Sequence, residues 1–133
     1  MSDRSPPSAP GGRRWVRSFA CAFRGLVILV STQANARIHL AATVIVVAAG
    51  FICGLSRVEW CAIVGVVTLV WVTEGVNSAI EALVDLVSPG HHPLAGRAKD
   101  LAAGAVLCAA VAAVAVGLIV FGPRVLRLVG AVS

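Results

Sequence analysis

The residues best suited to chemistry form an acidic line in the second half of the chain. Glu74, Glu81 and Asp85 are separated by seven and four residues, so on a helix they lie within roughly 40° of one line along its axis. Ser78 shares that face, and Asn77 lies at its edge. The surrounding sequence is apolar enough to span a membrane, where an acidic side chain costs about 2.5–3.5 kcal/mol even on the mildest scales. We therefore expect the acidic line to have a function.

Three uses remain open for these carboxylates. A metal-assisted catalytic site is the interpretation we favour, because carboxylates on one helix face can hold a cation or accept a proton. Ion or proton transport through an oligomer would use the same groups. The third possibility is a structural pairing of the carboxylates with arginines.

A second charged group lies where the last apolar stretch begins. It consists of Arg97, Lys99 and Asp100. A Lys–Asp pair at a helix start can hold phosphate and metal together. The alternative is that these basic side chains bind no ligand and simply extend from the membrane interface into water. His91 and His92 in the preceding loop offer further phosphate contacts. The chain has no GxxxxGK[ST] run and no kinase-type glycine-rich loop, so any nucleotide site must be of a different kind.

The composition places these groups in a membrane protein. Of 133 residues, 59% are hydrophobic and 13% are charged, and the mean hydropathy is +0.94. Average soluble domains have about 45–50% apolar and about 25% charged residues. A fold of this size could not bury so many apolar side chains in water. The net charge is +5, but no aromatic residues are interleaved with the basic ones, so we expect no nucleic-acid partner.

The hydropathy pattern predicts an all-α integral membrane domain over residues 13–127. Its first helix is amphipathic and lies on the membrane surface, with Arg13, Arg17 and Arg24 on the face opposite the apolar one. The elements that we expect are a disordered tail at 1–12, the surface helix at 13–36, spans at about 38–55, 60–87 and 100–122, and a short tail at 128–133. Pro123 closes the last span, and the loop between the last two spans extends to Lys99.

The basic residues predict how this domain is oriented. Eight of them lie in the N-terminal region and in the loop between the last two spans, whereas three lie on the other side. Because cytoplasmic flanks carry an excess of Lys and Arg, we expect the N-terminus and that loop to face the cytoplasm.

At these positions the chain resembles the prokaryotic diacylglycerol kinase family, small membrane lipid kinases that include the undecaprenol kinases of Gram-positive bacteria. The resemblance extends from about Arg14 to Pro123. Three motifs carry it: NARIH at 35–39, EGVNSAIEALVD at 74–85 and GRAKD at 96–100. The NARIH form looks closer to the undecaprenol kinase branch than to the Gram-negative enzymes.

The resemblance implies a fold, an assembly and a reaction. It implies a homotrimer with three spans and an N-terminal surface helix in each subunit, in the inner membrane of a bacterium. It also implies an active site shared between subunits at the cytoplasmic face. The implied reaction is the Mg²⁺-dependent transfer of phosphate from ATP to a lipid hydroxyl, either diacylglycerol or undecaprenol.

The resemblance also implies a role for individual residues. The family's general base falls on Glu74, and its metal-binding carboxylate falls on Glu81. The implied nucleotide contacts are Arg14, Glu81, Gly90, His91, His92, Lys99 and Asp100, and the implied substrate or supporting residues are Arg17, Asn35, Arg37, Asn77 and Ser78.

One position departs from the family's pattern. The family commonly has a second metal-binding glutamate in the surface helix, and this chain has Gln33 there. An amide oxygen can ligate Mg²⁺ but brings no charge, whereas Mg²⁺ prefers anionic oxygens. An inactive or weak member that serves as a lipid-binding scaffold therefore remains an alternative, beside an oligomeric ion or proton carrier.

Overall fold

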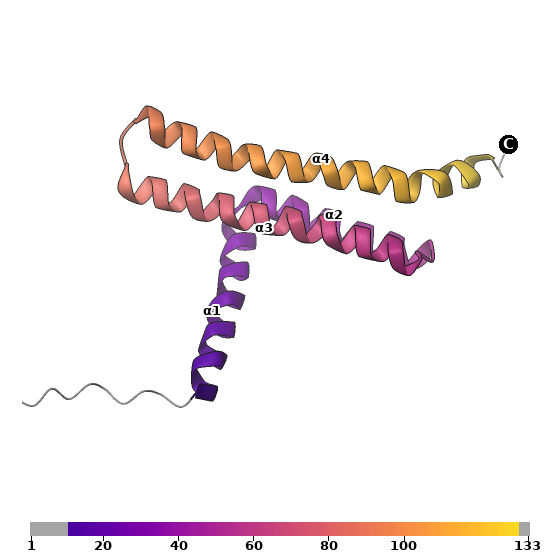
Figure 1. Cartoon of the computed structure of the whole chain (residues 1–133), viewed down its shortest axis with the longest axis horizontal. Helices are drawn as coiled ribbons and strands as arrows, with labels where there is room; N and C mark the ends of the chain where they lie inside the picture. Colours follow the sequence, from indigo (N-terminus) through magenta and orange to yellow (C-terminus); the bar gives the residue numbers. More distant parts are fainter. Residues whose placement is uncertain (1–10, 131–133) are drawn as a thin grey trace, which may run out of the picture.

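The computed structural model describes residues 11–130, and this part of the chain is all-helical, as the hydropathy pattern predicted. Residues 1–10 and 131–133, which are parts of the expected tails at 1–12 and 128–133, lie outside the described residues, and residues 128–130 belong to α4. The helices are α1 (Gly11–Thr32), α2 (Ala34–Ile52), α3 (Arg57–Val87) and α4 (Pro93–Gly130) (Figure 1). Gly11 and Gly12, which we had placed in the N-terminal tail, belong to α1.

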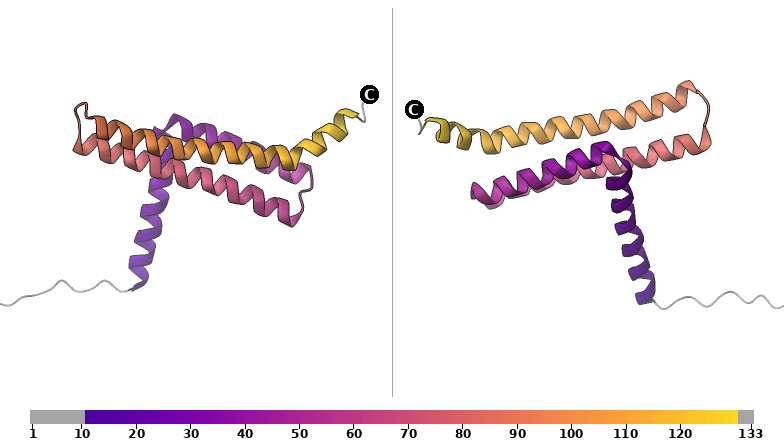
Figure 2. Two further views of the ribbon diagram at one scale, coloured as in Figure 1. Left: turned by 45° about the horizontal axis from the view of Figure 1, so that its top comes forward. Right: turned by 180° about the vertical axis from the view of Figure 1, so that it is seen from behind.

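Three helices form a layer from which the fourth projects. α3 and α4 run antiparallel and contact each other along most of their lengths, α2 packs against α3, and α1 points away from all three (Figures 1 and 2). Each of the four contains a stretch long and apolar enough to cross a membrane. The chain is therefore a membrane protein by this criterion, and the division into one surface helix and three spans stays a prediction.

The interior of this layer is small. Its cluster of buried side chains comprises Leu55, Ile63 and Val120, close to the turn between α2 and α3. Many of the other large apolar side chains face outward, as at Leu101 and Leu118 in α4, which are 75% and 68% exposed. Apolar exposure on this scale requires a lipid or a protein neighbour.

The junction between α1 and α2 falls earlier than the sequence suggested. We expected the first helix to continue to Ala36, but α1 ends at Thr32 and Gln33 is extended, with φ −98° and ψ 122°. Just before the break, the hydroxyls of Ser31 and Thr32 donate to the Ile28 carbonyl over 3.0 and 2.8 Å. Hydroxyls bonded back in this way compete with the helical pattern and bend helices.

The turn between α2 and α3 is held by specific contacts. Gly54 has a φ of +60°, which glycine adopts without strain. Ser56 and Glu59 form a capping box at the start of α3, in which each side chain bonds to the other's backbone N–H. A Cβ on Gly50 would lie 2.7 Å from Cη2 of Trp60, so the indole packs directly over the α2 backbone.

α4 is longer at both ends than the predicted third span. It begins at Pro93 rather than near residue 100, because proline suits the first position of a helix. The Leu94 N–H donates to Nδ1 of His92 over 3.2 Å, so His92 stands just before the first turn. At the other end Pro123 lies inside the helix, which bends and continues to Gly130 (Figure 2). A proline inside a helix can kink it instead of ending it.

Candidate functional site

The polar residues of the site lie on the buried stripe of α3. The buried residues of this helix are Ile63, Val70, Glu74 and Asn77, which recur at intervals of seven, four and three. That spacing puts all four on one face of the helix. Glu74 is 1% exposed and Asn77 is 6% exposed. The same face that packs apolar side chains at one end of α3 therefore buries a carboxyl group and an amide farther along.

Several polar atoms on this stretch have no partner among the described residues. They are Oε2 of Glu74, Oδ1 of Asn77 and Oγ of Ser78, and all three are buried. Nδ2 of Asn77 donates to Oε1 of Glu81 over 3.1 Å. A buried polar group without a partner costs about 1–3 kcal/mol. Their clustering over five consecutive positions indicates a place where polar atoms of a ligand complete the hydrogen bonding.

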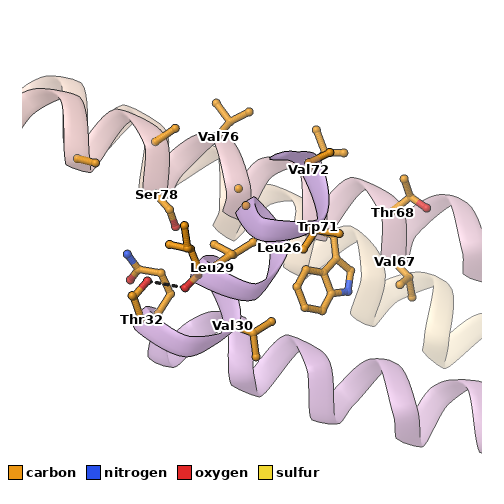
Figure 3. A pocket seen from close by; sticks show the side chains of 17 residues that line it. Leu26, Leu29, Val30, Thr32, Val67, Thr68, Trp71, Val72, Val76 and Ser78 are labelled. Carbon is orange, nitrogen blue, oxygen red and sulfur yellow. Dashed lines mark hydrogen bonds between the residues drawn. The ribbon is translucent and has the colours of Figure 1, made fainter. Parts of the chain in front are cut away.

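An apolar groove runs between α1 and α3 and reaches this polar stretch (Figure 3). Its volume is about 960 Å³, and Leu26, Leu29, Val72 and Val76 are among its apolar lining. Ser78 lies at its border and extends from α3 toward the end of α1 (Figure 3). Grooves that are mostly apolar with a few polar groups suit ligands of the same make-up, so this one suits a hydrocarbon chain with a small polar end.

Gln33 lines the same groove from the junction of α1 and α2. It occupies the N-cap position of α2, yet its side chain makes no capping hydrogen bond. The amide is therefore available to a ligand. The structure thus brings Gln33 and Ser78 to one groove, whereas Glu81, the other predicted metal ligand, does not line it.

An ion pair joins α3 to α4 near their connecting loop. Nζ of Lys99 lies 2.5 Å from Oδ1 of Asp85, and the two side chains are 37% and 67% exposed. Asp100 follows on α4 and is exposed. Sequence reasoning placed Asp85 on the acidic line but missed this pairing. The signal was the loop itself, since a hairpin brings residues on either side of it together.

The remaining predicted residues are exposed and are spread over the chain. Gly90 and His91 lie in the loop, and Asn35 and Arg37 lie in the first turns of α2. Arg14 lies on the far part of α1, about 28 Å along the helix from Gln33. Arg17 is one turn closer. Because α1 points away from the layer (Figure 1), a single subunit does not bring these two arginines to Glu81.

The oxygen atoms of this site fit Mg²⁺ in type. Carboxylate and amide oxygens are hard ligands, and Glu81 and Oδ1 of Asn77 supply them. Among residues 11–130, no three His, Cys, Asp or Glu side chains come together as a metal site. Phosphate oxygens and water would have to complete the coordination, which is usual for this ion.

A second ion pair lies at the opposite end of the α3–α4 hairpin. Nη1 and Nη2 of Arg124 reach Oε1 and Oε2 of Glu59 over 2.8 and 3.0 Å. Oε2 of Glu59 also accepts from the N–H and the hydroxyl of Ser56, both over 2.8 Å. Neither Glu59 nor Arg124 was singled out from the sequence, so this pair was not predicted. The pairing of a carboxylate with an arginine, which we weighed for the acidic line, occurs here.

Comparison with known proteins identifies the family. The sequence model of prokaryotic diacylglycerol kinase matches residues 20–121. The chain is 41% identical to an undecaprenol kinase of Bacillus subtilis over 111 residues, which cover 84% of this chain and 90% of that protein. It is 38% identical to a diacylglycerol kinase of Synechocystis over 92% of this chain and 78% of that protein. It therefore belongs to the prokaryotic diacylglycerol kinase family.

Proposed function

We propose that this lipid kinase transfers the γ-phosphate of ATP to the hydroxyl group of a membrane lipid, at the cytoplasmic face of a bacterial inner membrane. The observation that carries the proposal is a buried carboxyl group, Glu74, with an unpartnered oxygen, one helical turn along α3 from Ser78, which lines an apolar groove. The relatives act on undecaprenol or diacylglycerol by name, and both are hydrocarbon-rich molecules with one hydroxyl group.

Glu74 is the general base in this proposal. As the lipid oxygen bonds to the γ-phosphorus, the bond from phosphorus to the bridging oxygen of ATP breaks and ADP leaves. The hydroxyl proton passes to the Glu74 carboxylate. Burial of Glu74 keeps water from competing for that carboxylate. Ser78 and Gln33 lie at the groove where a lipid hydroxyl would arrive, and we assign them to its positioning.

Glu81 and Asn77 form the cation-binding part of the site. The hydrogen bond from Asn77 to Glu81 fixes the orientation of that carboxylate and leaves its other oxygen for a ligand. Glu81 lies about 10 Å along α3 from Glu74, toward the loop. Bound Mg²⁺ would neutralise charge on the phosphates of ATP. Glu74 thus lies deeper in the membrane, where the lipid acceptor would arrive, and Glu81 lies closer to the water, from which the nucleotide would bind.

The loop end of the hairpin is assigned to the nucleotide. Lys99 and Asp100 lie in the second turn of α4, directly after the loop with Gly90, His91 and His92. The Lys99 ammonium is held by Asp85 in an exposed position, within reach of water and of a soluble ligand. We assign Lys99 to a phosphate of ATP, because a mobile ammonium group makes a good point contact for phosphate.

A homotrimer is part of the proposal. Arg14 and Arg17 are too far along α1 to serve the Glu81 of the same subunit, so they would complete the site of a neighbour. The large exposed apolar faces of α2 and α4 provide surface for both lipid and subunit contacts.

The decisive test is phosphate transfer by the purified full chain in mixed micelles with ATP and Mg²⁺. Diacylglycerol and undecaprenol are offered separately, and Glu74→Gln serves as the inactive control. Transfer to either lipid that is lost in the control supports the proposal and names the acceptor. If a folded oligomer transfers phosphate to neither lipid, or if the Glu74→Gln variant is as active as the wild type, the proposed reaction or the proposed base is wrong.

Gln33 favours a second candidate, a weak or inactive member that binds lipid. The Gln33 amide carries no charge, and the described residues do not form a metal site of three acidic ligands. A Gln33→Glu variant separates the two functions. Strong activity in this variant beside an inactive parent supports the second candidate, whereas an active parent rejects it.

A further inference from the structure

A small pocket lies at the end of the α3–α4 hairpin that is remote from the proposed active site. Its volume is about 250 Å³, and it is lined by Glu59, Ile119, Val120, Pro123, Arg124 and Arg127. Glu59 and Glu81 are about 33 Å apart along α3, and the hydrocarbon core of a bilayer is about 30 Å thick. When the Glu81 end lies at one membrane surface, this pocket therefore lies at the headgroup level of the other.

The pocket carries one net positive charge. Glu59 has both carboxylate oxygens engaged by Arg124, and one of them also by Ser56. Arg124 is further held by the Val120 carbonyl, to which Nη1 donates over 2.6 Å. Among the described residues Arg127 has no such partner, and its side chain is exposed one turn away. Of the three charged groups that line the pocket, the Arg127 guanidinium is thus the one available to bind a ligand.

Pro123 leaves a backbone acceptor without its helical donor at Ile119, a residue that lines the pocket. Proline has no backbone N–H, so the carbonyl four residues earlier, that of Ile119, loses its usual helical donor. Ile119 lines the pocket, and its side chain is 74% exposed. The pocket therefore combines a guanidinium group, an acceptor for a hydroxyl and apolar surface for hydrocarbon.

We propose that this pocket binds the headgroup of an anionic phospholipid, with Arg127 on the phosphodiester. A phosphodiester carries one negative charge, which matches the net charge of the pocket. A hydroxyl-bearing headgroup such as glycerol can donate to the Ile119 carbonyl. A quaternary ammonium headgroup has no O–H or N–H to donate to that carbonyl, and its positive charge finds no free anion because the Glu59 carboxylate is already paired with Arg124. The pocket is thus selective for phosphatidylglycerol over phosphatidylcholine.

Native mass spectrometry of the full chain tests this selectivity. The protein is released from micelles that contain equal amounts of phosphatidylglycerol and phosphatidylcholine, and retained lipid is counted. One basic residue near a membrane surface is worth about fivefold in anionic lipid binding. We expect Arg127→Gln to lose phosphatidylglycerol retention by about that factor, and Arg127→Lys to lose less.

Arg57→Gln is the matched control, because Arg57 is exposed at the same end of α3 but does not line the pocket. It should leave retention unchanged. Equal losses in the Arg57 and Arg127 variants would show general attraction to positive charge and overturn the proposal, as would no loss in either.

Competition separates a lipid from a free phosphodiester. Displacement of the lipid by equimolar glycerophosphoglycerol, which has the headgroup without acyl chains, would overturn the assignment to a lipid. Unchanged circular dichroism and unchanged phosphate transfer show that the Arg127 variants are folded.

Discussion

The two ends of the α3–α4 hairpin use the same kinds of side chain in opposite ways. At the end where α3 begins, Glu59 forms a two-point ion pair with Arg124 and a capping box with Ser56. In the half of the hairpin nearer the loop, Glu74 is buried with an unpartnered oxygen, and the Asp85–Lys99 pair is exposed. One end satisfies its polar groups within the chain, and the other leaves them for a ligand.

Polar groups that hold the fold differ from polar groups that serve chemistry in whether the chain itself completes their hydrogen bonds. Buried polar groups in folded proteins are nearly always hydrogen-bonded, so unpartnered ones call for an explanation. The Glu59 carboxylate has both oxygens paired with Arg124, and this ion pair holds α3 to α4 through residues 65 positions apart. The unsatisfied carboxylate of Glu74 lowers stability in the free protein, and we attribute its presence to catalysis.

The largest effect is expected at Glu74. Glu74→Gln keeps the size of the side chain but removes its ability to accept a proton. We expect turnover to fall by about 10²–10⁴-fold, the usual contribution of a general base. Thermal unfolding in detergent should show equal or higher stability, because burying a neutral amide costs less than burying a carboxylate. Turnover near the wild-type rate would show that the unpartnered carboxyl group of Glu74 does not serve catalysis.

A large loss of stability is expected at Gly50, at the structural end. Gly50→Leu places a Cβ 2.7 Å from Cη2 of Trp60 and 3.0 Å from Cδ1 of Leu55. Overpacking of this kind costs about 1–3 kcal/mol, measurable as a lower unfolding midpoint. Gly65→Leu is the control, since a Cβ on Gly65 meets nothing within 4 Å. If both variants are equally stable, the Trp60 contact does not hold α2 against α3.

A smaller loss is expected when the Glu59–Arg124 pair is broken. Arg124→Gln and Glu59→Gln should each lower the unfolding midpoint while turnover stays near the wild-type rate. The double variant should lose less than the two single variants together, because both remove one interaction. Additive losses of stability would show that the two side chains act independently. A loss of turnover without a loss of stability would show that this ion pair contributes to catalysis.

The smallest effect is expected at the Asp85–Lys99 pair. Asp85→Asn should change stability by less than about 1 kcal/mol, because exposed ion pairs contribute little. Lys99 is then free to meet phosphate, so the KM for ATP should fall by at most about fivefold. Steady-state kinetics measure the change at low ionic strength. A KM that rises would show that Asp85 itself supports nucleotide binding.

Part of the candidate site could be predicted from the sequence because it depends on helix geometry alone. The acidic line on α3 follows from the spacing of its residues, and the hydrogen bond between Asn77 and Glu81, which we did not predict, joins two residues one turn apart on the same helix. Spacing does not say how deeply each residue is buried. The sequence analysis placed Asn77 at the edge of the face, whereas Asn77 is almost as buried as Glu74.

The ends of the helices were harder to predict, for a local reason. We expected Pro123 to end the last span at residue 122, and we expected the loop before that span to extend to Lys99. Pro93 instead begins α4, and Pro123 lies inside it. One residue type can start, kink or end a helix, and neighbouring contacts decide which. At Pro123 the Arg124 side chain binds the Val120 carbonyl and the Glu59 carboxylate across the bend.

The amino-acid sequence alone specifies the helical class, the need for an apolar environment and the types and spacing of the site residues. These properties depend on composition and on a period of 3.6 residues. Three features appear only once the chain is folded: the groove between α1 and α3, the Asp85–Lys99 pair and the Glu59–Arg124 pair. The two ion pairs join residues 14 and 65 positions apart. They depend on where each helix ends and on the register of α3 against α4, which side-chain packing sets and local periodicity does not.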